Sequence, residues 1–197
     1  GDSEYTFDNC FADVNEYYYP YTGSPVTPSV TVYDYYSGRD LVFGTDYIIV
    51  PDHDANIGEK TATIQGKGNY EGQSLEVNYC IEQDDLSTNT TMTVSDCVYT
   101  GSRVTPTVKV VHKGVTLTEG TDYTVSYTFD YWGDYDVGTY FAEISGMGNY
   151  KGYFEKSFRI TPKNASSATI TGKSSYTYEG YEVCPDFNVS IGGKKLS

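Results

Sequence analysis

The sequence predicts an all-β protein built from two full β-sandwich repeats and a partial third. Three observations lead to this prediction. The chain has 22 Tyr and 20 Gly among its 197 residues, and aromatic and β-branched side chains suit a pleated sheet better than a helix. No stretch keeps apolar residues at positions i, i+3, i+4 and i+7 over three turns, as an amphipathic helix would. Several motifs also occur twice, in the same order.

The internal repeat is carried by three motifs. Tyr-Thr-Gly-Ser-x-Val-Thr-Pro, Gly-Thr-Asp-Tyr and Gly-x-Gly-Asn-Tyr-x-Gly each occur twice, at offsets of 78, 76 and 80 residues. In order, the paired segments are residues 21–28 and 99–106, 44–47 and 120–123, and 66–72 and 146–152. The small drift in offset places insertions between strand-like runs, where loops are expected. A third copy begins at residues 178–180.

Strand signals alternate with turn signals inside each copy. The paired strand segments are residues 26–32 and 104–110, 47–50 and 123–127, 61–64 and 140–144, and 75–81 and 154–160. Gly-x-Gly-Asn-Tyr-x-Gly separates the last two strands, so it predicts a glycine-rich turn and not a phosphate-binding loop, which would open a helix. The Thr-Asp pair before Tyr47 and Tyr123 predicts a side chain to backbone hydrogen bond that fixes a turn.

The repeat divides the chain into three predicted segments. Repeat one covers residues 1–84, repeat two covers 85–164, and a partial third repeat covers 165–197. Polar stretches at 83–90 and 161–167 are the predicted linkers. A third of a sandwich cannot bury its own apolar face, so we expect the last segment to dock on repeat two or on another chain.

Charge and composition exclude several classes of protein. With 13 basic and 27 acidic residues the net charge is −14, which disfavours contact with nucleic-acid phosphates or anionic lipid headgroups. No run approaches about 18 apolar residues, so direct membrane insertion is not expected. The first residues show neither the basic flank nor the apolar core of a signal peptide, so such a peptide is either absent or already removed.

Together these motifs resemble the bacterial immunoglobulin-like repeat found in tandem in surface and secreted proteins of Gram-positive, often gut-dwelling, anaerobes. The resemblance rests on Tyr-Thr-Gly-x-x-Val-Thr-Pro-x-Val, Gly-Thr-Asp-Tyr, Val-Gly-Thr, Gly-x-Gly-Asn-Tyr-x-Gly and a last strand ending in Phe-Arg-Ile, and it spans nearly the whole chain. It implies tandem immunoglobulin-like sandwiches in an exported, extracellular or cell-surface protein, acting as stalk, spacer or adhesin modules. The family has no catalytic residues to carry over. The four cysteines and a Trp-bearing insertion depart from its pattern.

Four cysteines in a chain expected outside the cell predict two disulfides. Three connectivities are compatible with four cysteines. We favour Cys10–Cys80 and Cys97–Cys184, one bridge for each full repeat, with the second tethering the partial third repeat. Buried free thiols are the alternative. The spacing of the cysteines does not fit a zinc site.

An acidic insertion in the second copy is the candidate metal site. It covers residues 129–136, where the first copy has the shorter acidic stretch 52–56. Asp130, Asp134 and Asp136 offer hard oxygen ligands of the kind that Ca²⁺ prefers, although their spacing departs from that of an EF-hand loop. A solvated acidic loop is the competing interpretation.

The same insertion is the candidate ligand site. Tyr131, Trp132 and Tyr135 are rigid aromatics suited to stacking on sugar rings or gripping a protein partner. The competing interpretation is that they only cover the end of the sandwich. The aromatic runs at residues 17–19 and 33–36 of the first copy form a second candidate patch, because alternating strand positions must turn at least one Tyr of 17–19 outward.

No feature of the sequence predicts catalysis. His53 and His112 occupy non-equivalent positions and are each predicted to be surface residues, and no nucleophile-elbow, zinc-protease or Cys/His pattern occurs. We therefore expect a non-catalytic structural or adhesive module of a larger exported surface protein, with no cofactor beyond the Ca²⁺ considered above. A carbohydrate-binding module centred on Trp132 is the alternative. The expected partner is a host or microbial surface protein, or a glycan.

Overall fold

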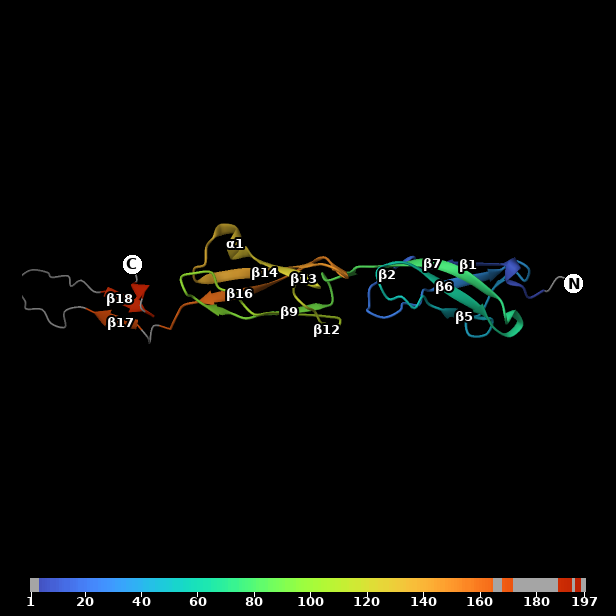
Figure 1. Cartoon of the computed structure of the whole chain (residues 1–197), viewed down its shortest axis with the longest axis horizontal. Helices are drawn as coiled ribbons and strands as arrows, with labels where there is room; N and C mark the ends of the chain where they lie inside the picture. The colour runs from blue at the N-terminus through green and yellow to red at the C-terminus, as the bar shows by residue number, and fades with distance from the viewer. Residues whose placement is uncertain (1–3, 165–167, 172–187, 193, 196–197) are drawn as a thin grey trace, which may run out of the picture. The chain divides into compact units, whose positions relative to one another are not determined.

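The structure is a computed structural model that describes residues 4–164, 168–171, 188–192 and 194–195 (Figure 1). Nearly all its regular structure is β-strand, arranged in several sheets, and this confirms the predicted all-β sandwich fold. The name copy one denotes residues 1–84, and copy two denotes residues 85–164.

Copy one contains two sheets. The first has the order β1-β3-β4 and the second the order β2-β7-β6-β5. Neighbouring strands are antiparallel except β2, which runs parallel to β7. The strands are β1 (Cys10–Val14), β2 (Tyr18–Pro20), β3 (Val30–Asp34), β4 (Arg39–Asp40), β5 (Tyr47–Val50), β6 (Gly58–Gly66) and β7 (Ser74–Glu82), with short 3-10 helices η1 (Phe7–Asn9) and η2 (Gly68–Tyr70).

Copy two repeats this strand order. One sheet has the order β12-β11-β9 and the other β10-β16-β14-β13, with β10 parallel to β16. Two features have no counterpart in copy one: the single helical turn α1 (Thr128–Trp132) and the short parallel pair of β8 (Asp84–Asp85) with β15 (Tyr150–Lys151). The other strands are β9 (Thr90–Val94), β10 (Cys97–Val98), β11 (Val108–His112), β12 (Val115–Thr116), β13 (Tyr123–Tyr127), β14 (Gly138–Gly146) and β16 (Tyr153–Thr161).

The compact units of the structure follow a different division from the repeat. One unit comprises Gly1–Met92, Val110–Val125 and Glu143–Phe154, and the other comprises Thr93–Lys109, Ser126–Ala142 and Glu155–Ser197. One end of copy two thus belongs to the same unit as copy one, and the predicted boundaries at residues 84 and 164 stay a prediction.

The C-terminal segment contains one further sheet. Its strands are antiparallel and lie in the order β17-β18-β19, formed by β17 (Ala168–Thr171), β18 (Asn188–Ile191) and β19 (Lys194–Lys195). Most of the predicted third repeat, including residues 178–180 where its motif begins, lies outside the described residues. Its docking therefore stays a prediction.

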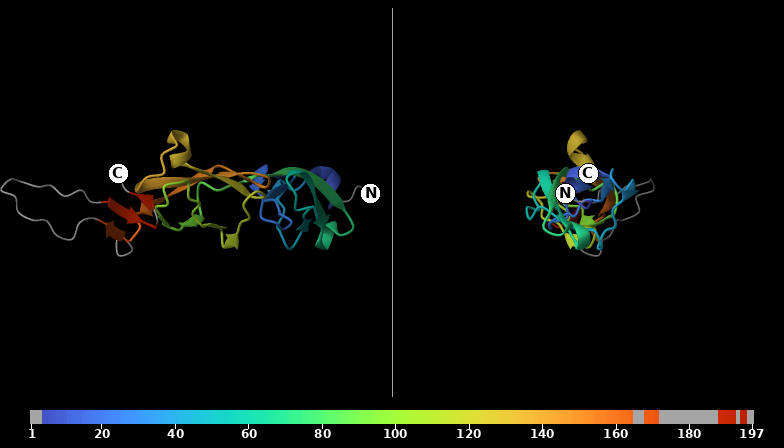
Figure 2. Two further views of the ribbon diagram at one scale, coloured as in Figure 1. Left: turned by 60° about the vertical axis from the view of Figure 1, so that its left-hand side comes forward. Right: turned by 90° about the vertical axis from the view of Figure 1, so that its right-hand side faces the viewer.

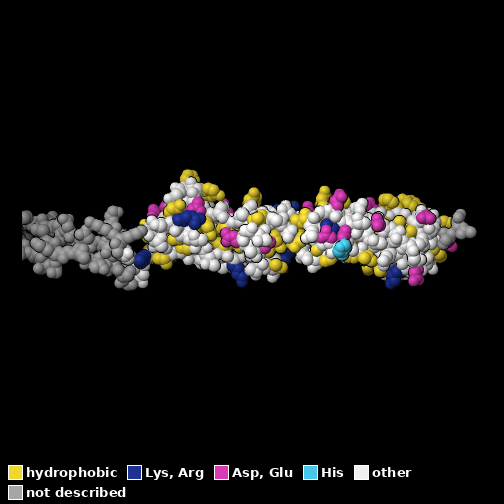
Figure 3. Space-filling model, in the orientation of Figure 1, with side chains coloured by type: hydrophobic (Ala, Val, Ile, Leu, Met, Phe, Trp, Pro, Cys, Tyr) yellow, Lys and Arg dark blue, Asp and Glu magenta, His cyan; other side chains and the backbone are white. Residues whose placement is uncertain are grey.

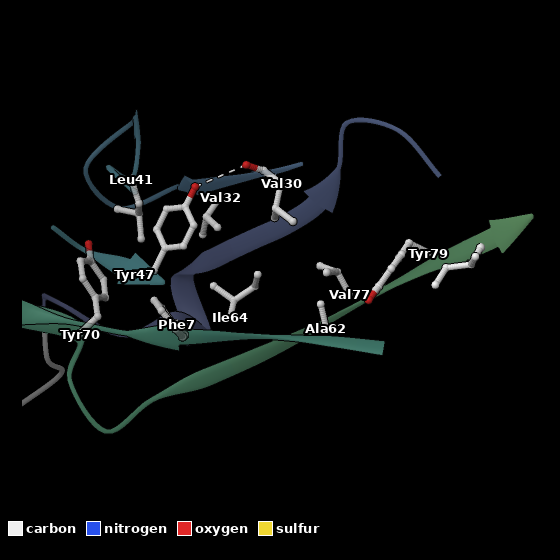
Figure 4. Close-up of a cluster of buried hydrophobic side chains, with 11 residues drawn as sticks. Phe7, Val30, Val32, Leu41, Tyr47, Ala62, Ile64, Tyr70, Val77 and Tyr79 are labelled. Atoms are coloured by element: carbon white, nitrogen blue, oxygen red, sulfur yellow. Dashed lines mark hydrogen bonds between the residues drawn. The ribbon is translucent and has the colours of Figure 1, made fainter. Parts of the chain in front are cut away.

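Alternation of side chains along the strands builds the core of copy one. The buried residues of β3, β6 and β7 fall at alternate positions, because successive side chains of a strand point to opposite faces of a sheet. Figure 4 shows the two inner faces meeting, with Val32 from β3 opposite Ile64 from β6. Tyr47 crosses the same space and its hydroxyl donates to the Val30 carbonyl oxygen at 3.4 Å.

The Thr-Asp turns form as predicted. Asp46 Oδ2 accepts a hydrogen bond from the Val42 amide at 2.8 Å, and Asp122 Oδ2 accepts one from the Thr118 amide at 2.8 Å. Each carboxylate therefore bridges the residues that lead into β5 or β13, which confirms the predicted side chain to backbone bond.

The Gly-x-Gly-Asn-Tyr-x-Gly motif forms the predicted turn between β6 and β7. A Cβ added to Gly66 would overlap the carbonyl oxygen of Tyr70, so the first glycine is required by close backbone approach. The last glycine, Gly72, has φ +85°, a left-handed conformation that L-residues with a side chain rarely adopt. The turn thereby directs the Tyr70 ring into the core, where it is fully buried.

Gly66→Ala is expected to lower the free energy of unfolding by about 3 kcal/mol, because the added methyl overlaps backbone that cannot move without breaking the turn. Gly44→Ala is the matched control. Gly44, unlike Gly66, has a positive φ, but a Cβ there meets nothing within 4 Å, so only the conformational cost of about 1 kcal/mol applies. Urea denaturation of both variants measures the difference, and equal losses would contradict the packing argument.

Candidate functional site

The insertion of copy two displays two aromatic side chains on α1. Trp132 is 85% exposed and Tyr131 is 66% exposed. In Figures 1 and 2, α1 projects away from strands β14 and β16. A helix of five residues is too short to be stable alone, so tertiary contacts must hold it. Gly133 ends it in the left-handed conformation, and its amide donates to the Phe129 carbonyl oxygen.

Phe129 fixes the helical turn α1 to the core of copy two. Its side chain is fully buried and stacks on the Tyr127 ring, with ring centroids 5.2 Å apart and planes 11° from parallel. Tyr140 and Phe158 contact it edge-on at 5.6 and 5.9 Å. Tyr135 also packs edge-on against Phe129, at 5.3 Å, and is half-buried. Tyr135 therefore belongs to the base of the insertion, whereas Tyr131 and Trp132 form its exposed end.

Arg103 clamps the outer side of α1. Its Nε and Nη2 atoms donate to the two carboxylate oxygens of Asp130 at 2.8 and 2.7 Å. The guanidinium carbon also lies 5.5 Å from the ring centroids of both Tyr127 and Phe129. Its hydrogen bonds to Asp130 lower the pKa of that carboxyl and raise the pKa of Arg103. In Figure 3, hydrophobic side chains lie at the outer end of the α1 projection, with basic and acidic side chains together below them.

The predicted Ca²⁺ ligands do not form a ligand set. Asp130 is engaged by Arg103, and Asp134 Oδ1 accepts a hydrogen bond from the Asp136 amide at 3.0 Å. The described part of the chain contains no group of three His, Cys, Asp or Glu side chains that could hold a metal ion. A cation would have to displace the Arg103 guanidinium, so the residues do not fit Ca²⁺ and the predicted site is not supported.

The predicted disulfides need correction. Cys10, Cys80 and Cys97 are free thiols, so the Cys10–Cys80 bridge is not formed. Cys97 is free as well, so its predicted bridge to Cys184 is not formed either; Cys184 itself lies outside the described residues.

The topology explains why Cys10 and Cys80 do not meet. The Phe7 amide donates to Gln73 Oε1 at 2.7 Å, which holds the segment before Cys10 near the start of β7. Cys80 lies seven residues beyond Gln73, or about 23 Å of extended strand, whereas a disulfide needs Cα atoms within about 7 Å. The two thiols consequently have separate partners: Cys10 Sγ donates to the Thr6 carbonyl and Cys80 Sγ to the Ile81 carbonyl.

A buried polar cluster in copy two was missed by the sequence analysis. His112 was predicted to lie at the surface but is 2% exposed. Its Nε2 lies 2.8 Å from Asp84 Oδ2, and its Nδ1 lies 2.8 Å from the Thr90 hydroxyl. Lys113 Nζ donates to both oxygens of the same Asp84 carboxylate, at 2.9 and 3.0 Å. His53, by contrast, is exposed as predicted.

The cluster has the chemical order of a hydrolase triad, and its contacts also hold Asp84 to His112 and Lys113. A carboxylate cannot donate, so His112 Nε2 donates to Asp84; Nδ1 faces the Thr90 hydroxyl, which also donates to the Thr88 carbonyl oxygen at 3.3 Å. This is hydroxyl, imidazole and carboxylate in sequence. However, Lys113 compensates the Asp84 charge and the imidazole is buried. The arrangement therefore satisfies buried polar groups and holds Asp84 in place.

The segment that joins the two copies is held to copy two along its length. Besides the Asp84 contacts, the Leu86 amide donates to the Lys151 carbonyl at 2.8 Å, and Leu86 is fully buried. The Gln83 side chain donates to the carbonyl oxygens of Gly148 and Tyr150 at 2.9 and 3.2 Å. Residues 83–86, predicted to be a polar linker, are thus an integral part of the end of copy two.

A comparison of the two copies could have identified this cluster. At the offset of 78 residues, His112 stands where copy one has Asp34. Asp34 is also buried, and its Oδ2 accepts a hydrogen bond from the Tyr70 hydroxyl at 2.7 Å. Burial alone would raise the pKa of Asp34, but the hydrogen bonds that it accepts lower it. A histidine that replaces a buried carboxylate must itself find hydrogen-bond partners there, which directs attention to nearby polar residues such as Asp84.

Copy one also exposes aromatic side chains, as the sequence predicted. Tyr35 and Tyr36 are 70% and 66% exposed. Tyr33 lies opposite Phe11 in the β1–β3 pairing and contacts the Tyr35 ring edge-on at 5.0 Å. Tyr18 points outward. Tyr33, Tyr35 and Tyr36 belong to the sheet of β1, β3 and β4 and to the turn after β3, whereas Tyr18 lies on β2 of the other sheet.

No family model matches the chain, and its sequence matches no curated protein. The likeness to bacterial immunoglobulin-like repeats therefore stays a prediction. Among the residues that the structure describes, no helix is long and apolar enough to cross a membrane.

Asp84→Ala is expected to lower the free energy of unfolding by about 3 kcal/mol, because His112 and Lys113 lose their common acceptor. Glu82→Ala is the control. It removes an exposed carboxylate 3.9 Å from Lys151 Nζ and should cost less than about 1 kcal/mol. Denaturant unfolding of the two single variants and the Asp84→Ala, Lys113→Ala double variant measures the coupling between these residues. Additive losses of stability would show that Asp84 and Lys113 do not stabilise the fold through their contact.

Cys10 is expected to resist alkylation in the folded protein. Burial, and then the nearby Asp34 charge, raise the pKa of its thiol from 9.0 to about 11. At pH 8 the thiolate population is therefore about 100-fold below that of an unperturbed thiol. Iodoacetamide labelling followed by peptide mass spectrometry, without reductant, measures the rate. Labelling of Cys10 as fast as after unfolding would contradict this environment.

Proposed function

We propose that the chain is a non-catalytic structural and adhesive module of a larger exported bacterial surface protein. The motifs that resemble tandem immunoglobulin-like surface repeats support the cellular setting, and the net charge of −14 supports a well-solvated extracellular segment. Its partner would be a host or microbial surface protein or a glycan.

The spacer role is supported mainly by one feature of each copy, the pairing of its second strand with its last strand. In copy one β2 lies parallel to β7, and in copy two β10 lies parallel to β16. When a copy is pulled by its two ends, load that passes the first strand (β1 or β9) reaches the second strand, and the second and last strands, being parallel, are drawn past each other along their length. Their inter-strand hydrogen bonds are then loaded together and not one after another. Such an arrangement suits a module that must transmit force.

The joining segment supports the same role. Residues 83–86 are held to copy two by backbone pairing and by the buried Asp84 cluster. A free linker would extend under load before either copy resisted. A segment tied into copy two instead passes load to its strands. The burial of His112 and Asp84 also supports a structural use of these groups over a catalytic one.

A second candidate function is carbohydrate binding, favoured by one observation. The one Trp of the chain, Trp132, is 85% exposed on a helical turn that is firmly anchored at its base. An exposed indole offers an apolar face with a polar edge, which suits the alternating apolar and hydroxylated surfaces of a sugar ring. Spacing and glycan binding are compatible in one adhesive module.

Single-molecule pulling through the two ends of the chain tests the spacer role. We expect a distinct cooperative unfolding event for each copy. Tyr21→Pro removes the amide that donates to the Glu82 carbonyl at 2.8 Å, and Tyr99→Pro removes the one that donates to Thr161 at 2.8 Å. Each proline should lower the unfolding force of its own copy and leave the other copy unchanged.

Tyr21→Ala and Tyr99→Ala are the matched controls, because they shorten the side chain but keep the amide donor. Unfolding forces that are the same in the proline and alanine variants would argue that the β2–β7 and β10–β16 pairs do not bear the load. Extension of the wild-type chain without resolved force peaks would reject the spacer proposal itself.

A further inference from the structure

The end of the sandwich that carries α1 in copy two can be compared with the equivalent end of copy one. In copy one, residues 51–57 connect β5 to β6 with no helix. The space beneath is closed by Lys60, which is buried and donates to Asp54 Oδ2 at 3.3 Å. In copy two, Tyr140 stands at the position of Lys60. The fold therefore closes this end without exposed aromatics, so the insertion of copy two is not needed for the sandwich itself.

Two sequence differences at this end belong together. Copy two has the α1 insertion, and it also has Arg103 where copy one has Pro25 in the repeated Tyr-Thr-Gly-Ser motif. Arg103 binds Asp130 on α1 through two hydrogen bonds and lies over the rings of Tyr127 and Phe129 at its base. The arginine therefore braces the inserted turn, and the turn presents its two largest side chains to solvent.

The chemistry of the exposed end selects a class of ligand. Tyr131 and Trp132 offer aromatic faces that stack on the C–H faces of sugar rings. Asp134 and Asp136 follow directly and are exposed, and carboxylates are acceptors for sugar hydroxyls. The net charge of −14 opposes anionic polymers such as uronic-acid polysaccharides. The favoured ligand is thus a neutral sugar chain.

The geometry of α1 also selects the physical form of that ligand. Consecutive residues of a helix project about 100° apart, so Tyr131 and Trp132 cannot form one flat surface. A crystalline polysaccharide presents a flat face and would meet only one of the two rings. A single hydrated chain can bend around the end of the helix and contact both.

We propose that α1 and Arg103 form a binding site for a single, soluble, neutral polysaccharide chain. Trp132 and Tyr131 contact sugar rings, and Arg103 is a positioning residue that holds α1 in its helical form. The inference rests on the carbohydrate-binding candidate above and specifies its ligand.

Affinity electrophoresis of the full chain tests the site. Native gels contain soluble starch, galactomannan or hydroxyethyl cellulose as neutral chains, and polygalacturonate as the anionic comparison. Pull-down on crystalline cellulose and chitin tests flat surfaces. We expect retardation by at least one soluble neutral polymer, and no binding to polygalacturonate or to the crystalline polymers.

Matched aromatic variants locate the contact. Trp132→Ala should weaken binding about tenfold or more, as for the central aromatic of a small interface, and Tyr131→Ala should weaken it less. Tyr36→Ala is the control, because Tyr36 in copy one has the same exposed fraction as Tyr131, 66%. Its affinity should equal that of the wild type.

Arg103 variants test positioning. Arg103→Gln and Arg103→Pro should each weaken binding about threefold; proline is the residue at the equivalent position of copy one. Without Arg103, ordering α1 costs free energy at the moment of binding. Fluorescence anisotropy of Trp132 without ligand should fall in both variants, a change that lost contact with the ligand alone would not cause. The charge swap Arg103→Asp with Asp130→Arg should restore both affinity and anisotropy.

Three outcomes would contradict the proposed site. Binding that survives Trp132→Ala would place the ligand elsewhere, and equal binding to crystalline polymers would reject the single-chain form. Retardation by none of the soluble polymers would overturn this inference and the carbohydrate-binding candidate together. The spacer proposal would stand or fall separately, on the pulling experiment.

Discussion

The buried tyrosine of each glycine-rich turn is the contact on which one end of each copy depends. In copy one the Tyr70 ring is fully buried, stacks on Phe7 at 5.4 Å and donates its hydroxyl to Asp34, whose other oxygen caps the following turn. In copy two the Tyr150 ring lies edge-on to His112 at 5.9 Å. The Nε2 of that imidazole lies 2.8 Å from the carboxylate of Asp84 in the joining segment. The same turn thus closes copy one locally and binds the joining segment in copy two.

The opposite end of each copy shows how a repeated fold acquires a separate property. The loop between the fifth and sixth strands of each copy is free to vary, because it forms no part of either sheet. Copy one closes it with the buried Lys60, which pairs with the solvent-exposed carboxylate of Asp54. Copy two closes it with the buried Phe129 and adds Arg103 across the outside. Because the buried Phe129 closes this end, the outer residues of α1 project outward, and the exposure of Trp132 follows from how the end is closed.

Sequence reasoning succeeded where the determining interaction is local. Alternation along β6 and β7, the glycine turn after Gly66, and the Asp46 turn are each set within a few residues, so their patterns are visible in order along the chain. It failed where a partner lies far away. The number of cysteines does not tell that Cys10 lies near the start of β7 and Cys80 near its end. His112 was assigned to the surface because its acceptor, Asp84, is 28 residues away in the sequence. Asp130 was taken for a metal ligand because Arg103, 27 residues earlier, was not recognised as its partner.

The sequence by itself determined the fold class, the positions of the main strands, the repeated order of the motifs and the segment where exposed aromatics would lie. These follow from period-two alternation and from glycines whose backbone conformation admits few other residues. Only the tertiary structure decided which polar groups are buried together, that Cys10 and Cys80 stay apart, and that Tyr135 supports the insertion while Tyr131 and Trp132 are displayed. The reason is physical: the cost of burying a charge or exposing a ring depends on neighbours that only folding brings into contact.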